Sequence, residues 1–247
     1  MMPCESLINI PQRKLYDALE QTIRNCAVCS GKQEMRIDQG LCAQCRVLNK
    51  VLHRYAESNI PVKYWPLEMD HHFYGDETLK TKYLEITSDL AQSYRVGVSM
   101  CFAGSHGLGK TMASCNILKR AVEKGYSALY VNLNDIINVI LGKETDDKAV
   151  ARKELMVVDF LVIDEFDPRF MPSDKAADLF GKVLEEIFRA RHQNGLPIFM
   201  CTNSPNVVES FTGNIKASIT SLMNTVTIVP LLGQDFRKKL AQKGTTK

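Results

Sequence analysis

The sequence predicts an α/β protein whose main domain is a parallel β-sheet covered by helices on both faces. Three observations carry this prediction. Apolar runs alternate with helical stretches from about residue 75 onward, a glycine-rich turn joins one of these runs to a helix, and four cysteines near the N-terminus form two CxxC pairs. The first two observations favour one α/β domain, and the third adds a small module in front of it.

The strands and helices follow in order from the hydrophobic periodicity. Apolar runs predict parallel strands at residues 98–103, 128–131, 156–163, 197–201 and 226–229. Helices are expected over residues 80–94, 110–123, 135–141 and 174–192, with a further helical region before the last strand. Because strands of this kind are apolar on both sides, the sheet needs helices on both of its faces.

The composition excludes a membrane or fibrous protein. Hydrophobic residues make up 45% of the chain and charged residues 24%. No apolar run reaches the roughly 18 residues that a membrane-spanning helix needs, and the N-terminus lacks the apolar stretch of a signal peptide. We therefore expect a cytoplasmic protein without a membrane partner. The net charge of +3 permits nucleic-acid binding but does not argue for it.

The glycine-rich turn G-S-H-G-L-G-K-T matches the phosphate-binding P-loop pattern in full and stands between a predicted strand and a predicted helix. Its backbone N–H groups and the helix N-terminus would bind phosphate oxygens. Lys110 is expected on the β- and γ-phosphates, and the Thr111 hydroxyl on Mg²⁺. His106 is expected to be solvated rather than catalytic. The residues expected to contact ATP are Gly104, Ser105, His106, Gly107, Leu108, Gly109, Lys110, Thr111 and Met112.

Two further strand ends carry polar residues that suit the same site. The third strand ends in Asp164 and Glu165, and ligand sites of parallel sheets lie at the carboxyl ends of the strands. We expect Asp164 to hold Mg²⁺ and Glu165 to activate the attacking water. Asn203, after the fourth strand, would place an amide beside the γ-phosphate. Lys110, Glu165 and Asn203 are therefore the expected catalytic residues.

The N-terminal cysteines have the spacing of a structural zinc site. Cys26 and Cys29 form one pair, Cys42 and Cys45 form the other, and residues 30–41 separate them. Four thiolates would close a tetrahedron around Zn²⁺ that stabilises folding rather than supporting catalysis. An iron–sulfur cluster and four unliganded thiols are the alternatives.

A basic helical stretch follows the last cysteine. Its charges are either an ordinary solvated face or a DNA- or protein-binding face, and they are Arg46, Lys50, His53 and Arg54. The prolines of Ile60-Pro61 and Trp65-Pro66 then interrupt helix formation. We expect three parts: a zinc-binding, partner-docking module at residues 1–58, a linker at 59–74 and an ATPase domain at 75–247.

The nucleotide-site elements together resemble the AAA+ ATPases, and most of all the DnaC/DnaI/IstB group of bacterial and phage helicase loaders and transposition ATP-binding proteins. The resemblance covers residues 58–240 and rests on F-A-G-S-H-G-L-G-K-T, G-Y-S-A-L-Y-V-N-L-N-D, L-V-I-D-E and P-I-F-M-C-T-N. It implies a five-stranded sheet in the order 5-1-4-3-2, a reduced or absent lid, and a sensor role for Asn203. It also implies that the zinc module docks on a replicative helicase.

One departure from this group concerns an arginine that usually precedes the last strand and reaches the neighbouring subunit's γ-phosphate. Here Lys216 is the only basic residue of that stretch, so the identity of a trans-acting cation stays open. Arg189, Arg191 and Arg169 are further candidates. Arg237 stands where such proteins often carry a late arginine near the nucleotide, and a plain basic tail is the alternative.

The resemblance implies an ATP-dependent loader that delivers a replicative helicase onto single-stranded DNA and associates with itself through the ATPase domain. A transposition regulator of the IstB kind is the first alternative, although such regulators commonly lack a zinc module. The second is an adaptor that binds ATP without hydrolysing it, which the missing arginine favours and Glu165 opposes. A small-molecule kinase fits less well, since no lid or substrate pocket is evident.

Overall fold

The structure, a computed structural model, describes residues 14, 17, 42–142, 145–171, 174–213, 215–233 and 235–236. Within these residues the chain forms a five-stranded parallel sheet in the order β2-β3-β4-β1-β5, which confirms the predicted order. The strands are β1 Met100–Ala103, β2 Ala128–Asn132, β3 Phe160–Asp164, β4 Ile198–Thr202 and β5 Thr227–Pro230.

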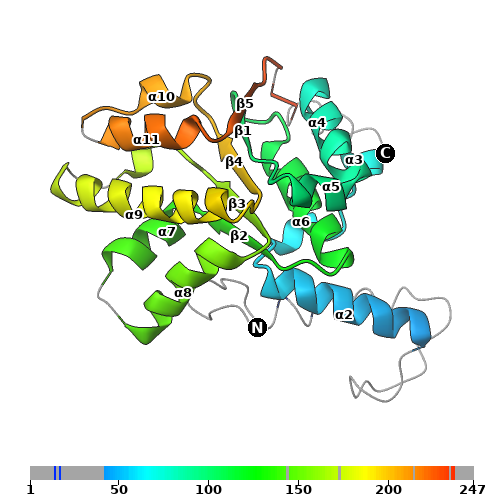
Figure 1. The fold of residues 1–247 in the computed structure, drawn as a ribbon. Helices are drawn as coiled ribbons and strands as arrows, with labels where there is room; N and C mark the ends of the chain where they lie inside the picture. Colours follow the sequence, from blue (N-terminus) through cyan, green and yellow to red (C-terminus); the bar gives the residue numbers. More distant parts are fainter. Residues whose placement is uncertain are drawn as a thin grey trace.

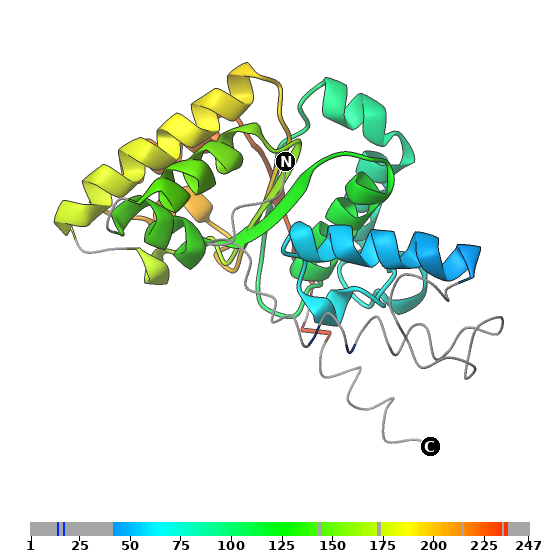
Figure 2. The ribbon, with the colours of Figure 1, turned by 90° about the horizontal axis from the view of Figure 1, so that it is seen from below.

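Helices cover both faces of the sheet, as Figures 1 and 2 show. The first face carries α2 Ala43–Glu57, the 3₁₀ turn η2 Val62–Tyr64, α3 Met69–His72, α4 Glu77–Ser88, α5 Leu90–Arg95 and α6 Lys110–Glu123. The second carries α7 Leu133–Leu141, α8 Asp146–Val157, the 3₁₀ turn η3 Pro168–Phe170, α9 Asp174–Gln193, α10 Val207–Ser210 and α11 Ile215–Met223. None of the described helices has the length and apolar character to cross a lipid bilayer.

Each face of the sheet has its own apolar core, because side chains alternate along a strand. In β3, Leu161 and Ile163 face α9, whereas Phe160 faces α6. On the α6 face, Phe160, Phe199 and Phe102 stack on neighbouring strands with ring centroids 6.5 Å apart. The stacked rings hold β3, β4 and β1 together beneath α6.

The helix predicted over residues 80–94 is in fact two helices. Asp89 separates α4 from α5, and its side chain accepts a hydrogen bond from the Gln92 N–H at the start of α5. An aspartate in this position caps a new helix more favourably than it continues an old one. The periodicity continued across the break because Ile86 and Leu90 face the same core.

The third strand is also shorter than predicted. It begins at Phe160 rather than at residue 156, because Met156 and Val157 are the last residues of α8. The sequence analysis did not predict α8. Thr145 caps its first turn, but the helix is largely polar and buries only Ala151 and Leu155, so its apolar stripe is too weak to stand out.

Residues 59–74, expected to be a linker, pack against α6. Ile60, Trp65 and Met69 are buried in the core on this face of the sheet. The Lys119 ammonium, which is fully buried, donates to the carbonyl oxygens of Trp65 and Leu67 at 3.0 and 2.8 Å. It also pairs with Glu68 at 2.6 Å, and Arg120 pairs with the second oxygen of Glu68 at 2.7 Å. Two consecutive cations of α6 therefore hold this segment.

We expect the Lys119→Met substitution to lower the free energy of unfolding by about 3 kcal/mol, because buried carbonyl oxygens and a carboxylate lose their donor. Lys82→Met is the matched control, since Lys82 also pairs with a glutamate at 2.6 Å but lies on the surface. It should cost less than about 1 kcal/mol. Urea unfolding of both variants measures the difference, and equal losses would contradict the clamping role of Lys119.

Candidate nucleotide-binding site

The carboxyl ends of three neighbouring strands bring the predicted site together. β1 and β4 end side by side, since Ala103 lies opposite Thr202 and the Gly104 N–H donates to the Thr202 carbonyl at 3.3 Å. β3 lies on the other side of β4 and ends in Asp164. The P-loop, the acidic pair and Asn203 therefore leave the sheet at one edge, as the sequence predicts for a parallel sheet.

The P-loop closes around its own lysine. Lys110 is only 7% exposed, and its ammonium donates to the carbonyl oxygens of Gly104 and Ser105 at 2.8 and 2.6 Å. Ser105 and His106 are exposed, as expected for the outer rim of the loop. Lys110 is the first residue of α6, so the positive end of that helix and a mobile ammonium face the same space. This arrangement suits an anion such as a polyphosphate.

Two glycines of the loop have left-handed backbones and no room for a side chain. Gly107 has a φ of 77°, and a Cβ there would lie 1.8 Å from the Asp235 carboxylate. Gly109 has a φ of 88°, and a Cβ there would lie 2.4 Å from the ring of Phe73. Any other residue would strain the backbone and displace a neighbour at either position.

Segments far apart in the sequence thus support the loop from two sides. From the N-terminal side, the Asp76 N–H donates to the Leu108 carbonyl at 3.2 Å, and the Asp76 carboxylate caps α4. From the C-terminal side, the Phe236 N–H donates to the Gly107 carbonyl at 3.1 Å. The Asp76 carboxylate also accepts from the Gly233 N–H at 3.1 Å and so joins the two supports. Neither of these two supports was predicted from the sequence, although Gly75-Asp76 before a helix is a recognisable capping signal.

The Asp164 carboxylate is the most heavily bonded group of the site. Its Oδ2 accepts from the Thr111 hydroxyl at 2.8 Å and from the Tyr130 hydroxyl at 2.7 Å, and its Oδ1 accepts from the Glu165 N–H at 2.8 Å. Burial and the neighbouring Asp164 charge raise the pKa of Tyr130 well above its usual range, so this phenol stays protonated and donates. Sequence reasoning did not identify Tyr130, whose side chain reaches Asp164 only through the pairing of β2 with β3.

Glu165 differs from Asp164 in its exposure to solvent and in its backbone conformation. It is exposed, and its φ of 53° places a non-glycine residue in the left-handed region. Such a backbone costs about 1–3 kcal/mol and is concentrated at functional sites. The turn directs the two neighbouring carboxylates differently: Asp164 stays in the protein, whereas Glu165 faces solvent at the same strand end. A buried carboxylate suits a metal ligand, and a solvent-facing carboxylate suits a general base.

A second tyrosine lies beside the Thr111–Asp164 pair. Burial raises the pKa of Tyr64 above its usual range, the charge of Asp164 raises it further, and a hydrogen bond with Thr111 acts against this rise. Tyr64 belongs to η2 and packs against the α6 core, so the segment expected to be a linker reaches the site itself. No pattern in the sequence pointed to this residue.

The donor set fits a magnesium–nucleotide complex. Thr111 offers a hydroxyl and Asp164 a carboxylate, which are the hard oxygen ligands that Mg²⁺ prefers. These two groups already lie within one hydrogen bond of each other, and Lys110 is close by at the start of the same helix. Met112 is half-buried against the core and supports α6 rather than facing solvent. Asn203, half-buried, directly follows β4 beside the loop.

The candidate cations for a neighbouring subunit's nucleotide differ in accessibility. Arg191 is fully buried and donates to the carbonyl oxygens of Leu155, Asp159 and Pro197, so it is a structural residue and the wrong candidate.

The other candidates are exposed or half-buried. Arg169 is 64% exposed and forms a bidentate pair with Asp167, whose pKa it lowers. Lys216 lies in the first turn of α11 and pairs with Glu209 at 2.7 Å, and Arg189 pairs with Glu185.

Three predicted site residues lie outside the described part of the chain: Cys26, Cys29 and Arg237. Of the other two zinc-site cysteines, Cys42 caps α2 and its sulfur accepts a hydrogen bond from the Cys45 N–H at 3.4 Å. Among the described residues, no three His, Cys, Asp or Glu side chains group to hold a metal ion. The described residues thus contain two of the four predicted zinc ligands and no metal-binding group around them.

Comparisons with known proteins agree with this site. Residues 95–194 match the family of IstB-like ATP binding proteins, and no curated protein matches the chain. The crystal structure of DnaI matches with a TM-score of 0.56 at 18% identity, over 70% of this chain and 94% of that one. The crystal structure of the DnaC helicase loader matches with a TM-score of 0.51 at 18% identity, over 69% and 99%.

A third solved structure is the replication initiator DnaA bound to AMPPCP and single-stranded DNA. Its TM-score is 0.54 at 16% identity, and the match covers 75% of this chain but only 56% of the DnaA chain. At these identities the structures share a fold, and the family match adds the ATP-binding segment. Residues 95–194 are therefore similar to the IstB-like ATP binding proteins, and the described chain has the fold of the DnaI, DnaC and DnaA structures.

Proposed function

We propose that this protein is an ATPase that loads a replicative DNA helicase onto single-stranded DNA, with ATP binding and hydrolysis switching its assembly and release. The observation that carries the ATPase proposal is the Thr111–Asp164 hydrogen bond beneath a complete P-loop, with Glu165 exposed at the same strand end. A P-loop that served only as a turn would need neither the paired magnesium ligands nor a solvent-facing carboxylate.

Each residue has a distinct task in this proposal. Phosphate oxygens would replace the loop carbonyls as acceptors for Lys110. Bound Mg²⁺, held by Thr111 and Asp164, would neutralise charge on the phosphates. Glu165 would accept a proton from the attacking water, and Asn203 would orient that water from the end of β4. Arg237 would contact the phosphates from the C-terminal side, next to the segment that already binds Gly107.

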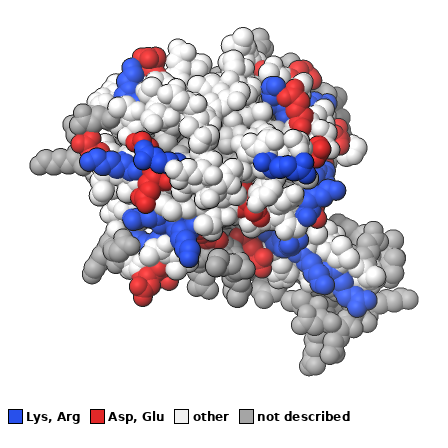
Figure 3. All heavy atoms as spheres, viewed as in Figure 1, with Lys and Arg blue, Asp and Glu red and all other residues white. Residues whose placement is uncertain are grey.

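The helicase and DNA partners are proposed from the relatives. The DnaC structure is that of a helicase loader, and the DnaA structure holds single-stranded DNA. The exposed face of α2 supports a phosphate-bearing partner, since Arg46, Lys50 and Arg54 follow one another at helical spacing. Figure 3 shows Lys and Arg atoms over this helix at the edge of the molecule. Loading of this kind takes place in the cytoplasm and uses self-association through the ATPase domain.

An IstB-like transposition regulator is the second candidate, because the family match over residues 95–194 is to IstB-like proteins. The two functions differ in their DNA. A loader acts on single strands together with a helicase, whereas such a regulator assembles on duplex DNA without one.

We expect Glu165→Gln to bind ATP normally and to lose turnover by about 10²-fold or more, because an amide cannot accept the proton of the attacking water. Lys110→Ala is the companion variant and should lose ATP binding itself. Titration with a fluorescent ATP analogue measures ATP binding, and steady-state phosphate release measures turnover. Wild-type turnover in Glu165→Gln would remove this residue from the catalytic role.

Hydrolysis by the protein alone should be slow, because a cation supplied from a neighbour is worth roughly 10³-fold or more in rate and no arginine lies between Arg191 and Arg237. We expect single-stranded DNA to raise the rate and helicase plus single-stranded DNA to raise it further. The measurement is the steady-state ATPase rate with each addition. Lys216→Ala tests whether Lys216 is the cation that acts on a neighbour's nucleotide, and Lys182→Ala, at an exposed position on α9, is the control. Stimulation by duplex DNA alone would favour the IstB-like function instead.

We further propose that Cys26, Cys29, Cys42 and Cys45 bind one structural Zn²⁺ per chain and that residues 1–58 form the helicase-docking module. Elemental analysis of the purified full chain should find one zinc, and Cys42→Ser should lose it while nucleotide binding persists. Cys115→Ser is the matched control, because Cys115 is a buried residue of α6, far from the CxxC pairs in sequence. Iron in place of zinc, or no metal in the wild type, would contradict the zinc site.

A further inference from the structure

Tyr130 forms hydrogen bonds through both its side chain and its main chain, and the two sets of partners lie in different parts of the fold. Its side chain donates to the Asp164 carboxylate at 2.7 Å. Its main-chain N–H donates to the Ser58 carbonyl at 2.9 Å, and its carbonyl accepts from the Asn59 side-chain amide at 2.9 Å. Ser58 and Asn59 directly follow the last residue of α2. One residue of β2 therefore connects the magnesium site to the end of the helix that carries the basic face.

The side-chain bond decides how the Asp164 carboxylate is presented. Each carboxylate oxygen can accept about two hydrogen bonds. Oδ2 is filled by Thr111 and Tyr130, whereas Oδ1 has one partner, the Glu165 N–H. The two hydroxyl donors therefore fix the rotation of the carboxylate and leave, by this count, one acceptor position on Oδ1. Groups that orient a metal-binding carboxylate in this way typically contribute 10–100-fold to metal affinity.

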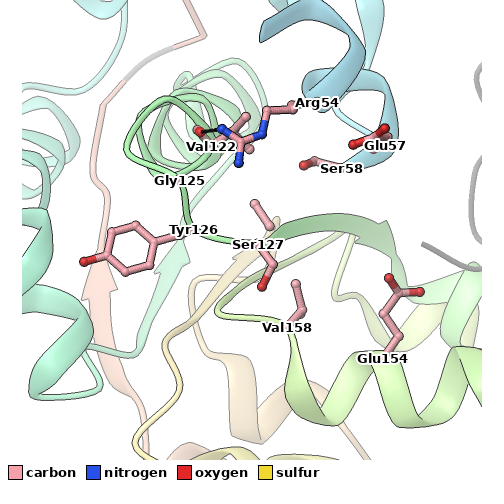
Figure 4. A pocket seen from close by; sticks show the side chains of 10 residues that line it. Arg54, Glu57, Ser58, Val122, Gly125, Tyr126, Ser127, Glu154 and Val158 are labelled. Carbon is pink, nitrogen blue, oxygen red and sulfur yellow. Dashed lines mark hydrogen bonds between the residues drawn. The ribbon is translucent and has the colours of Figure 1, made fainter. Parts of the chain in front are cut away.

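The main-chain hydrogen bonds join β2 to the two residues after α2, at the side of a polar hollow. β2 is an edge strand, and Ser58 and Asn59 cover its outer side. Beside this contact lies a polar hollow of about 260 Å³. Figure 4 shows Glu57 and Ser58 on one side of this hollow and Ser127 and Glu154 on the other. The end of α2 thus meets the edge of the sheet through these hydrogen bonds, while the apolar side chains around it, among them Ala56 and Ile60, are buried in the core around α6.

We propose that Tyr130 is a positioning residue that orients Asp164 for magnesium and links the occupancy of that site to the end of α2. The inference rests on the proposed magnesium–ATP site, but it does not depend on the helicase or DNA partners. It predicts that the hydroxyl of Tyr130 affects magnesium affinity and, separately, that α2 responds to magnesium and nucleotide only while the hydroxyl is present.

The first experiment is a magnesium titration of the full chain at a fixed concentration of a fluorescent non-hydrolysable ATP analogue. Tyr130→Phe keeps the ring and removes the hydroxyl. The magnesium concentration at half-saturation should rise about tenfold, while binding of the analogue without magnesium stays unchanged. Tyr126→Phe is the matched control, since Tyr126 precedes the same strand and packs its ring against Tyr94 and Phe160. It should leave the titration unchanged.

The second experiment uses Trp65, the single tryptophan of the chain. Its ring centroid lies 6.2 Å from that of Tyr55 on α2, and its indole donates to the Ile60 carbonyl at 2.7 Å. The emission of Trp65 therefore reports on the contact between α2 and the following segment. Magnesium with the ATP analogue should shift this emission in the wild type and in Tyr126→Phe, but not in Tyr130→Phe at saturating magnesium.

The outcomes separate the two parts of the proposal. An unchanged magnesium requirement in Tyr130→Phe overturns the positioning role, provided that thermal unfolding shows the variant folded as the wild type is. A raised magnesium requirement in Tyr130→Phe with an undiminished Trp65 response upholds the positioning role and overturns the link to α2. The absence of any Trp65 response in the wild type also overturns that link. Failure of helicase stimulation with both results intact would refute the loader proposal alone.

Discussion

A single buried carboxylate, that of Asp164, constrains the arrangement of this domain. Removing a carboxylate from water costs several kcal/mol unless hydrogen bonds replace the water. Three donors do so here: the Thr111 hydroxyl on α6, the Tyr130 hydroxyl on β2 and the N–H of the next residue, Glu165. The carboxylate is satisfied only when α6, β2 and β3 hold their observed positions, so the chemistry of the site and the packing of the sheet depend on the same contacts.

The P-loop depends in the same way on parts of the chain that are distant from it in sequence. Phe73 and Asp76 support it from the N-terminal side, and Asp235 and Phe236 from the C-terminal side. The side chains of Asp235 and Phe73 lie against Gly107 and Gly109, whose left-handed backbones strain any other residue. The glycines of the motif therefore serve two purposes, since they expose N–H groups to phosphate and admit the neighbouring segments.

Local patterns were sufficient to predict the motifs but not the residues that position them. The P-loop and the Asp164–Glu165 pair followed from the sequence, because each depends on a few consecutive residues, and the strand order followed from the family that the sequence resembles. Tyr130 could not be identified in this way, since its role depends on the pairing of β2 with β3. The segment at 59–74 was misjudged for a similar reason: its prolines suggested a linker, while its burial depends on Lys119, far along the chain.

The contact between the C-terminal segment and the P-loop has a consequence for synthesis of the protein. The ribosome makes the P-loop long before β5, yet β5 pairs with β1, and the Leu231 N–H donates to the Ala103 carbonyl at 2.7 Å directly before the loop. While residues 227–236 remain in the exit tunnel, the emerging chain lacks one of the segments that support its P-loop. The loop can therefore reach its final surroundings only after these residues have left the ribosome.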